Sequence, residues 1–305
     1  MVLNNSSYLF SVVIPTYNRA HLILNTLDSV RNQTYCNYEL IIIDDGSSDN
    51  TAKVVKNYIS DNELKNWYYY YKINEERAAA RNYGVQKSRG TFVTFLDSDD
   101  MFYPDHLSLA SSFVSDNKDV KVFHSAYEFR NQKNVLIRKV NYPKNGSLNE
   151  AVLKGNIISC FGMFLKSDVL RDLKFKESKE LSGSEDWLLW LEVSARYKIY
   201  FQSQISGCMI QHDERSVLSF NEVKLLTRTN LIVNYLNDDE KFVQKYGAKI
   251  INRIHGHMLT YSSLHLLLSG YKLKALKLFF KGIKYSPSEL FKIRTLAFCK
   301  HLFLK

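Results

Sequence analysis

Residues 38–47 read Tyr-Glu-Leu-Ile-Ile-Ile-Asp-Asp-Gly-Ser, an apolar run that ends in two carboxylates. The same pattern recurs at Leu96-Asp97-Ser98-Asp99-Asp100, and a third acidic signature follows at Glu185-Asp186-Trp187. In open α/β sheets, ligands bind outside the carboxyl ends of the strands. Carboxylates at those ends can hold a metal ion and a ribose, so the pattern indicates a fold and a site together.

Four apolar runs fall within the first hundred residues and alternate with longer, helix-like stretches. They cover residues 9–14, 38–43, 67–71 and 91–96 and are rich in Val, Ile, Phe and Tyr. This alternation predicts an α/β fold with a mainly parallel central sheet and helices on both faces. The polar segment Pro15 to Arg19 follows the first run, so we expect it to share one crevice with the acidic segments.

Helices are predicted at residues 20–33 and 75–88, and at 187–197 on the basis of apolar residues at helical spacing. The segment Ser182-Gly183-Ser184 is a predicted cap for the last of these helices. Glu185 and Asp186 would then lie in its first turn.

Composition excludes several classes of protein. The four cysteines are far apart and show no Cys-x-x-Cys pair, so neither a zinc ribbon nor a disulfide framework is indicated. The net charge of +10 suggests an anionic partner, but nucleic acid is disfavoured because no RNA-recognition, zinc-finger or basic-zipper pattern occurs. We find no signal peptide and no apolar run long enough to span a membrane, and we expect a cytoplasmic protein.

Taken in order, four motifs resemble those of the family 2 glycosyltransferases of the GT-A fold. They are Val12 to Arg19, Asp44 to Thr51, Ala80-Arg81-Asn82 and Phe95 to Asp100. The resemblance is close over about the first 110 residues, is looser through Glu185-Asp186-Trp187 and fades after about residue 220. We therefore expect a GT-A domain at 1–219 and a helical C-terminal region at 220–305, associated with membrane or acceptor.

The resemblance implies an inverting transfer of a hexosyl or N-acetylhexosaminyl group. The donor would be a UDP-sugar, the acceptor a hydroxyl of a glycan or polyprenyl-linked glycan, and the pathway the biosynthesis of a bacterial surface polysaccharide such as lipopolysaccharide or capsule. A diphosphate leaving group gains negative charge as the glycosidic bond breaks, and Mn²⁺ or Mg²⁺ would neutralise it. Asp99 is the first choice of metal ligand, with His212 as a second.

By the same resemblance, one set of residues would bind the donor. Thr16 and Tyr17 would contact the uracil, and Asp45 would accept a hydrogen bond from it. The full predicted set is Pro15, Thr16, Tyr17, Asp45, Arg81, Asp97 and Arg215. The segment before Ala80 lacks the glycine often found there, so whether Arg77 or Arg81 reaches the donor is left open.

Inversion needs a general base on the acceptor side, and Asp186 is the predicted base. The exposed backbone N–H groups at the start of a helix favour an ionised carboxylate at this position. Glu185 is the second candidate. Asn156 and Ser159 are predicted to line the sugar pocket.

The C-terminal third is predicted to be helical, and residues 271–285 place Lys274, Lys277, Lys281 and Lys284 on one face. This face suits either an anionic membrane, at the inner face of the cell membrane, or simple solvation.

Two further functions stay open. A sugar nucleotidyltransferase shares a similar sheet but needs a glycine-rich loop after the first strand, where this chain has Pro15 to Arg19. A catalytically silent carbohydrate-binding scaffold is the third hypothesis. The absence of Gly-x-Gly-x-x-Gly disfavours a dinucleotide oxidoreductase.

Overall fold

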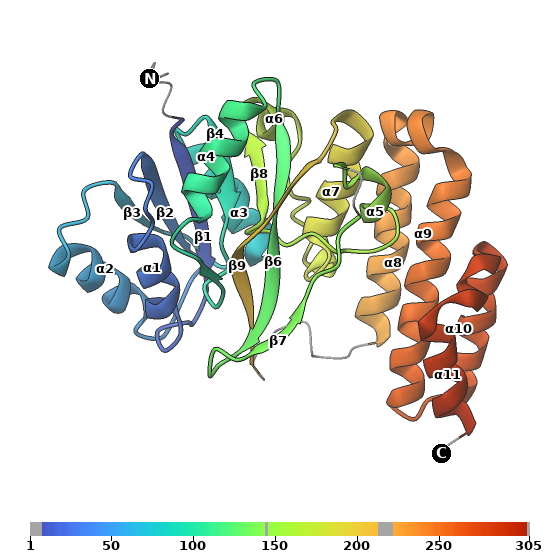
Figure 1. Cartoon of the computed structure of the whole chain (residues 1–305). Helices are drawn as coiled ribbons and strands as arrows, with labels where there is room; N and C mark the ends of the chain where they lie inside the picture. The colour runs from blue at the N-terminus through green and yellow to red at the C-terminus, as the bar shows by residue number, and fades with distance from the viewer. Residues whose placement is uncertain (1–7, 144–145, 213–221, 304–305) are drawn as a thin grey trace.

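The fold is known from a computed structural model that describes residues 8–143, 146–212 and 222–303. A single mixed β-sheet forms its centre (Figure 1). The strands are β1 (Phe10–Thr16), β2 (Tyr38–Asp44), β3 (Trp67–Tyr71), β4 (Phe92–Phe95), β5 (Met101–Phe102), β6 (Val122–Asn131), β7 (Leu136–Lys139), β8 (Met163–Lys166) and β9 (Tyr200–Gln211). The four strands predicted within the first hundred residues are thus confirmed to within two residues at either end.

The sheet order is β3-β2-β1-β4-β8-β6-β9-β5, with β7 paired to β6. The first four strands are parallel, and β8 joins β4 in the antiparallel sense. Because β1 lies between β2 and β4, the segments that follow these three strands meet at one edge of the sheet. The expected α/β fold with a mainly parallel N-terminal sheet is therefore present.

Helices cover both faces of the sheet and continue past it. The first seven are α1 (Ile23–Arg31), α2 (Thr51–Asp61), α3 (Glu76–Lys87), α4 (His106–Asp116), α5 (Asn149–Val152), α6 (Ser167–Asp172) and α7 (Glu185–Arg196). The last four are α8 (Glu222–Asp238), α9 (Glu240–Leu268), α10 (Lys272–Tyr285) and α11 (Ile293–Phe303). The 3₁₀ turns among the described residues are η1 (Lys179–Leu181) and η3 (Pro287–Phe291).

Helix α1 begins three residues later than the sequence predicts, and the reason is local hydrogen bonding. Asn18 adopts a left-handed φ of 50°. The backbone N–H groups of Arg19 and Ala20 donate to the side chains of Thr51 and Asp49 rather than entering a helix. The loop after β1 is therefore tied to the loop after β2.

Helix α3 packs closely on the centre of the sheet. A Cβ atom on Gly84 would lie 2.3 Å from Cγ1 of Val13, so only glycine allows this approach. The contact places Arg81, one helical turn earlier, directly under the carboxyl edge of the sheet.

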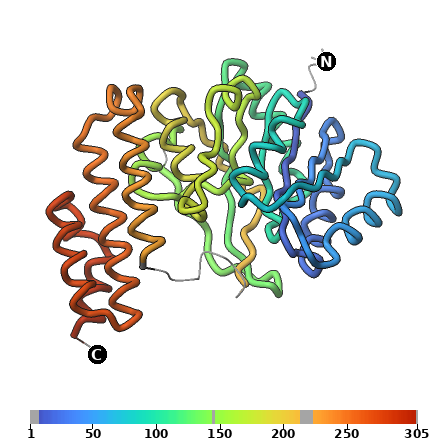
Figure 2. Tube along the Cα trace, turned by 180° about the vertical axis from the view of Figure 1, so that it is seen from behind, coloured from blue at the N-terminus to red at the C-terminus, as the bar shows by residue number. Residues whose placement is uncertain are grey.

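Helices α8 and α9 belong to the same hydrophobic core as the sheet. Ile232 and Leu236 of α8 and Phe242 of α9 are fully buried in one cluster with Val13 of β1 and Trp190 of α7. Helices α10 and α11 instead close a smaller cluster around Phe279 and Phe298 at the far end of α9. Figures 1 and 2 show α10 and α11 on the side of α9 away from the sheet. Among the described residues, no helix is long and apolar enough to cross a membrane.

Candidate functional site

The loops after β1 and β2 form one connected rim. The side-chain oxygen of Asn18 accepts hydrogen bonds from the backbone N–H groups of Ser48 and Asp49, at 2.8 and 3.3 Å. The Asn18 N–H donates in turn to Oγ of Ser47 at 2.9 Å. Asn tolerates the left-handed conformation that these bonds require. The rim is therefore held by its own polar groups.

Two neighbouring aspartates on this rim have different surroundings. Asp44 is fully buried and accepts hydrogen bonds from the Ser47 N–H and the Tyr69 hydroxyl, which is a structural arrangement. Asp45, predicted to meet the donor base, accepts hydrogen bonds at Oδ1 from the Lys72 ammonium (2.9 Å) and the Glu75 N–H (3.1 Å). Asp45 thus holds the segment before α3 in place, and its contact with the base stays a prediction.

The predicted base-binding residues at the end of β1 differ in exposure. Pro15 and Thr16 are buried in the strand, whereas 47% of Tyr17 is exposed just beyond it. The Thr16 hydroxyl is buried and has no hydrogen-bond partner among the described residues. A buried hydroxyl without a partner is costly, so a ligand with a polar edge would satisfy it.

The two predicted metal ligands, 113 residues apart in the sequence, meet in space. Nε2 of His212 lies 3.0 Å from Oδ2 of Asp99, and both side chains are largely buried. Asp100, the residue after Asp99, holds this part of β9 in place. Its Oδ1 accepts a hydrogen bond from the backbone N–H of Ile210, two residues before His212. Arg215, predicted to contact the diphosphate, lies outside the described residues.

The donor set suits a divalent cation only in part. Asp99 offers carboxylate oxygen and His212 an imidazole nitrogen, which together suit Mn²⁺ better than Mg²⁺. In the described part of the chain, no group of three or more His, Cys, Asp and Glu side chains is arranged to hold a metal. An ion here would therefore need further oxygen ligands from the donor diphosphate and water.

Arg81 links the acidic motif after β4 to the start of α7. Its Nη2 donates to Asp97 at 2.7 Å and its Nη1 to Glu185 at 2.8 Å. Its side chain is only 2% exposed and also lies over the Phe175 ring. Arg81 therefore holds two carboxylates apart at a fixed separation, and its predicted contact with the nucleotide stays a prediction.

Glu185 is a buried, ionised partner of arginine. Burial favours its neutral form, but the Arg81 and Arg77 guanidinium groups outweigh this and lower the pKa of Glu185. Its Oε2 accepts a hydrogen bond from the Gly183 N–H at 2.6 Å, and its Oε1 lies 3.8 Å from Nε of Arg77. With both oxygens engaged, Glu185 is poorly placed to accept a proton.

Asp186 is in the opposite electrostatic situation. Burial, and then the negative charge of Glu185, raise the pKa of Asp186 to about 6. The Asn156 amide donates to both of its carboxylate oxygens, at 3.2 and 3.1 Å, and the Cys160 thiol lies 3.9 Å from Oδ2. A carboxylate with a pKa near neutrality is suited to accept a proton.

The predicted cap of α7 is wrong in its chemistry. Ser184 occupies the N-cap position, but its hydroxyl donates back to the Gly183 carbonyl and does not cap the helix. The Trp187 N–H is instead satisfied by Asp186 itself, at 2.7 Å. Ser159, predicted to line the sugar pocket, is buried and donates or accepts at His124 and Gly162, so it has a structural role.

One residue beside this site is not among those the sequence predicts. Arg228 of α8 has its guanidinium against Gly183, two residues before Glu185. An isolated arginine in a helix carries no motif, and only the packing of α8 against α9 and η1 brings it here. The sequence contains no signal that would identify it.

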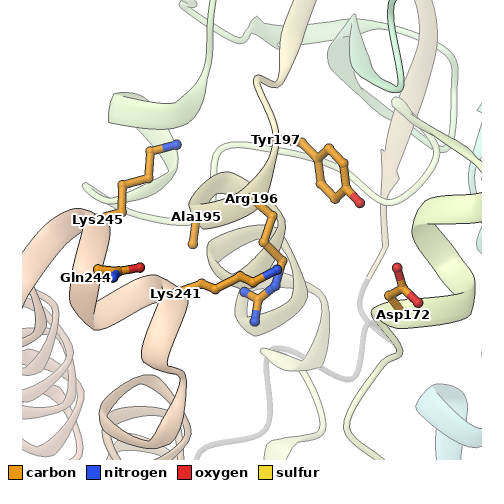
Figure 3. A pocket seen from close by; sticks show the side chains of 7 residues that line it. All are labelled: Asp172, Ala195, Arg196, Tyr197, Lys241, Gln244 and Lys245. Carbon is orange, nitrogen blue, oxygen red and sulfur yellow. The ribbon is translucent and has the colours of Figure 1, made fainter.

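A cavity of about 620 Å³ lies at the other end of α7, among Arg196, Tyr197 and Lys241 (Figure 3). Arg196 is already paired with Asp239 at 2.6 Å, and the Lys245 ammonium donates to the Ser194 carbonyl. Asp186 lies ten residues before Arg196 on α7, so this cavity is about 15 Å from Asp186 along the helix. It is separate from the candidate site.

The fold and the site together have the features of a GT-A nucleotide-sugar transferase. These are an α/β sheet with helices on both faces, acidic loops at its carboxyl edge, and a carboxylate with a raised pKa beyond them. The profile described as Glycosyl transferase family 2 matches residues 11–172. The chain belongs to glycosyltransferase family 2.

Individual relatives agree with this family. The Escherichia coli enzyme named UDP-Glc:alpha-D-GlcNAc-diphosphoundecaprenol beta-1,3-glucosyltransferase WfgD is 32% identical over 72% of this chain and 83% of its own length. Among solved structures, Staphylococcus aureus TarS 1–349 with UDP-GlcNAc has a TM-score of 0.71 at 20% identity, covering 96% of this chain and 88% of its own. A Pyrobaculum calidifontis mannosyltransferase with GDP-Man and Mn²⁺ has a TM-score of 0.57 at 17% identity, covering 97% of this chain and 87% of its own.

The chain is shorter than some of its relatives. Three uncharacterized glycosyltransferases of Rickettsia species are 29% identical to it, and the match spans only 34 to 40% of their length.

Proposed function

We propose that the protein is a metal-dependent, inverting glycosyltransferase that moves a hexosyl or N-acetylhexosaminyl group from a UDP-sugar to a hydroxyl of a lipid-linked or glycan acceptor. The observation that carries the proposal is the pair of carboxylates at the start of α7. Glu185 is held ionised by Arg81, whereas the pKa of Asp186 is raised to about 6. Separating two adjacent acids in this way assigns one to structure and the other to proton transfer.

In this mechanism Asp186 accepts the proton of the attacking acceptor hydroxyl, and Asn156 orients its carboxylate. Arg81 joins Glu185, the residue next to this base, to Asp97, on the side where the donor ribose would lie. Asp99 and His212 would hold a divalent cation, which neutralises the departing diphosphate when it is bound. Thr16 and Tyr17 would hold the uracil.

The choice of a UDP-sugar and a lipid-linked acceptor is supported by the name of the E. coli relative, whose donor is UDP-Glc and whose acceptor is a diphosphoundecaprenol-linked GlcNAc. The TarS structure likewise holds UDP-GlcNAc as its ligand. Biosynthesis of a bacterial surface polysaccharide is the corresponding process.

Calorimetric titration of UDP and of GDP, with Mn²⁺ and with chelator, tests the donor and metal assignments. We expect metal-dependent binding of UDP alone, lost in Asp99→Ala because an oxygen ligand is removed. Asp186→Asn should bind UDP as the wild type does and transfer no sugar. Sugar transfer at the normal rate by Asp186→Asn would show that Asp186 is not the base. Failure of the protein to bind UDP would favour the catalytically silent carbohydrate-binding scaffold.

Contact with an anionic membrane through the C-terminal helices is part of the proposal. Phe291 of η3 and Ile293 and Phe303 of α11 are 92, 85 and 83% exposed. The exposed lysines of α10 lie in the same part of the chain. Aromatic and aliphatic side chains next to lysines suit the interface of an anionic bilayer.

Sedimentation with vesicles containing about 30% phosphatidylglycerol tests this contact. The double variant Phe291→Ser with Ile293→Ser should stay in the supernatant. Val135→Ser, which changes an exposed apolar residue between β6 and β7, should sediment with the vesicles as the wild type does. Equal sedimentation of all three proteins would argue against the contact.

A further inference from the structure

Arg228 lies on the acceptor side of the candidate base. A Cβ atom on Gly183 would be 3.6 and 3.8 Å from its Nη1 and Nη2 atoms, so the guanidinium lies against the backbone just before α7. Gly183 has a φ of 89°, which favours glycine and leaves this surface without a side chain. The guanidinium of a C-terminal helix thereby reaches the start of α7.

This guanidinium has no partner in the described part of the chain. No hydrogen bond or ion pair joins it to the described residues, and its Nε is buried without an acceptor among them. Burial lowers the pKa of Arg228, even though the charges of Glu185 and Asp186 act in the opposite direction. A partly desolvated cation of this kind gains when an anion binds to it.

The nearby carboxylates do not account for Arg228. Glu185 is already paired with Arg81 at 2.8 Å and accepts the Gly183 N–H. Asp186 is satisfied by Asn156 and by the Trp187 N–H. Both carboxylates therefore have hydrogen-bond partners without Arg228, and the guanidinium of Arg228 is paired with neither of them.

A second guanidinium lies on the same side. Arg77 of α3 has its Nε 3.8 Å from Oε1 of Glu185, and its charge is close enough to Arg228 to lower the pKa of Arg228 further. The charge of Glu185 acts on both arginines, which come from the distant segments α3 and α8.

The position separates this anion from the donor. Asp99 and His212, where the donor diphosphate would lie, are on the Asp97 side of Arg81. Arg228 and Arg77 are on the Glu185 side, and the charge of the neighbouring Asp186 acts on Arg228. An anion bound there would belong to the molecule that delivers the attacking hydroxyl.

We propose that Arg228 binds a phosphate group of the acceptor next to the hydroxyl that Asp186 deprotonates. A guanidinium presents a planar fork that matches phosphate oxygens, and the chain as a whole carries a charge of +10. This inference rests on the proposed function and adds the chemical class of the acceptor. The phosphate is supplied either by a sugar linked to a lipid diphosphate or by a phosphodiester polymer.

The test uses small phosphate probes on the full chain, saturated with UDP and Mg²⁺ so that the donor site is filled. Glucose 1-phosphate represents the sugar phosphate, glycerophosphoglycerol the phosphodiester, and methyl glucoside the acceptor without charge. Binding is followed by NMR line broadening of the probes. We expect at least one phosphate probe to bind and methyl glucoside to bind at least about 10-fold more weakly.

Arg228→Gln should weaken binding of the phosphate probe about 10-fold or more, and Arg228→Lys should weaken it less because the charge remains. Arg171→Gln, which removes an exposed arginine on α6, is the matched control and should bind as the wild type does. UDP affinity should be equal in all four proteins. Equal binding of the phosphate probe by Arg228→Gln and wild type, or the absence of binding of both phosphate probes to the wild type, would overturn the proposal. Failure of the protein to bind UDP would instead count against the proposed function. The probe titration can be repeated without UDP, so the two failures can be told apart.

Discussion

At the scale of single residues, the site is organised by how charge is divided between Glu185 and Asp186. The two are adjacent in the sequence, yet Arg81 holds one ionised while burial raises the pKa of the other to about 6. The pairing of Glu185 comes from a residue distant in the sequence, whereas the pKa of Asp186 is raised by burial and by its neighbour Glu185. An acidic pair at the start of a helix is common, and only the surroundings distinguish a base from a structural acid.

The rate of transfer should therefore depend on the protonation of Asp186. We expect the rate to be constant above about pH 7 and to fall about tenfold per pH unit below about pH 6, as measured by UDP release at saturating substrates. Asn156→Ala removes two hydrogen bonds that favour the ionised form, so the inflection should move to higher pH. An unchanged inflection in Asn156→Ala would show that another group titrates.

The same raised pKa has a consequence for stability. The ordinary pKa of Asp186 is 3.8 and the folded value is about 6, so its contribution to stability is fully present below about pH 4 and is lost as pH rises through about 6. At pH 7 Asp186→Asn should increase the free energy of unfolding by about 1 to 3 kcal/mol, and at pH 4 by much less. Urea unfolding at the two pH values measures the difference, and an equal effect at both would contradict the raised pKa.

Arg81 should matter for stability as well as for activity. Arg81→Met leaves Glu185 buried without its main partner, which should lower the free energy of unfolding by about 3 to 5 kcal/mol in urea at pH 7. Adding Glu185→Gln to Arg81→Met should recover part of the loss. Lys121→Met breaks an exposed pair with Asp168 and should change stability little. A small effect of Arg81→Met would mean that Glu185 is neutral in the fold.

The structure brings some of the predicted site residues together, but their side-chain partners are not predicted from the sequence. Asp99 and His212 are both predicted as metal ligands and are 3.0 Å apart, although nothing in their local sequence links them. Asn156 is predicted to line the sugar pocket, but neither its bonds to Asp186 nor the approach of Cys160 is predicted, because both residues come from a segment between α5 and β8 that has little regular structure. Arg228 escapes prediction because helix packing, and no motif, determines its position.

At the scale of elements, strands are easier to predict than helix ends. The apolar runs of β1, β2 and β4 have clear limits because both faces of these strands are largely buried. Helix α1 begins three residues after its predicted start because Arg19 and Ala20 bond to the loop after β2, a contact between segments about 30 residues apart. Local propensity contains no information about such bonds.

The crossing of α9 and α10 depends on two glycines. A Cβ atom on Gly256 would lie 2.7 Å from the Gly282 carbonyl and 2.5 Å from Cβ of Ser286. Gly256→Ala should force the helices apart and lower the free energy of unfolding by about 1 to 3 kcal/mol. Lys249→Ala, an exposed change on the same helix, should not, and UDP affinity should be normal in both variants. A stable Gly256→Ala protein would mean that α10 shifts at little cost.

At the scale of the whole molecule, the predicted boundary at 219/220 stays a prediction, but the core runs through it. Ile232, Leu236 and Phe242 are buried with residues of β1 and α7. Calorimetry should therefore show α8 and α9 unfolding together with the sheet in one main transition. A chain ending at residue 270 should keep that transition, whereas a chain ending at 219 should lack it. A cooperative transition in the chain ending at 219 would contradict this expectation.

The ion pairs that join Asp97, Arg81 and Glu185 also predict which residues should be conserved together among related enzymes. Exchange of Arg81 alone would leave Glu185 inside the protein without its main partner. Over evolutionary time Arg81 and Glu185 should therefore be kept or lost together, even where the sugars used by related enzymes diverge. In an alignment of relatives, a lineage that replaces Arg81 should also have replaced Glu185, while Tyr17 and the surface of α11 vary independently of both.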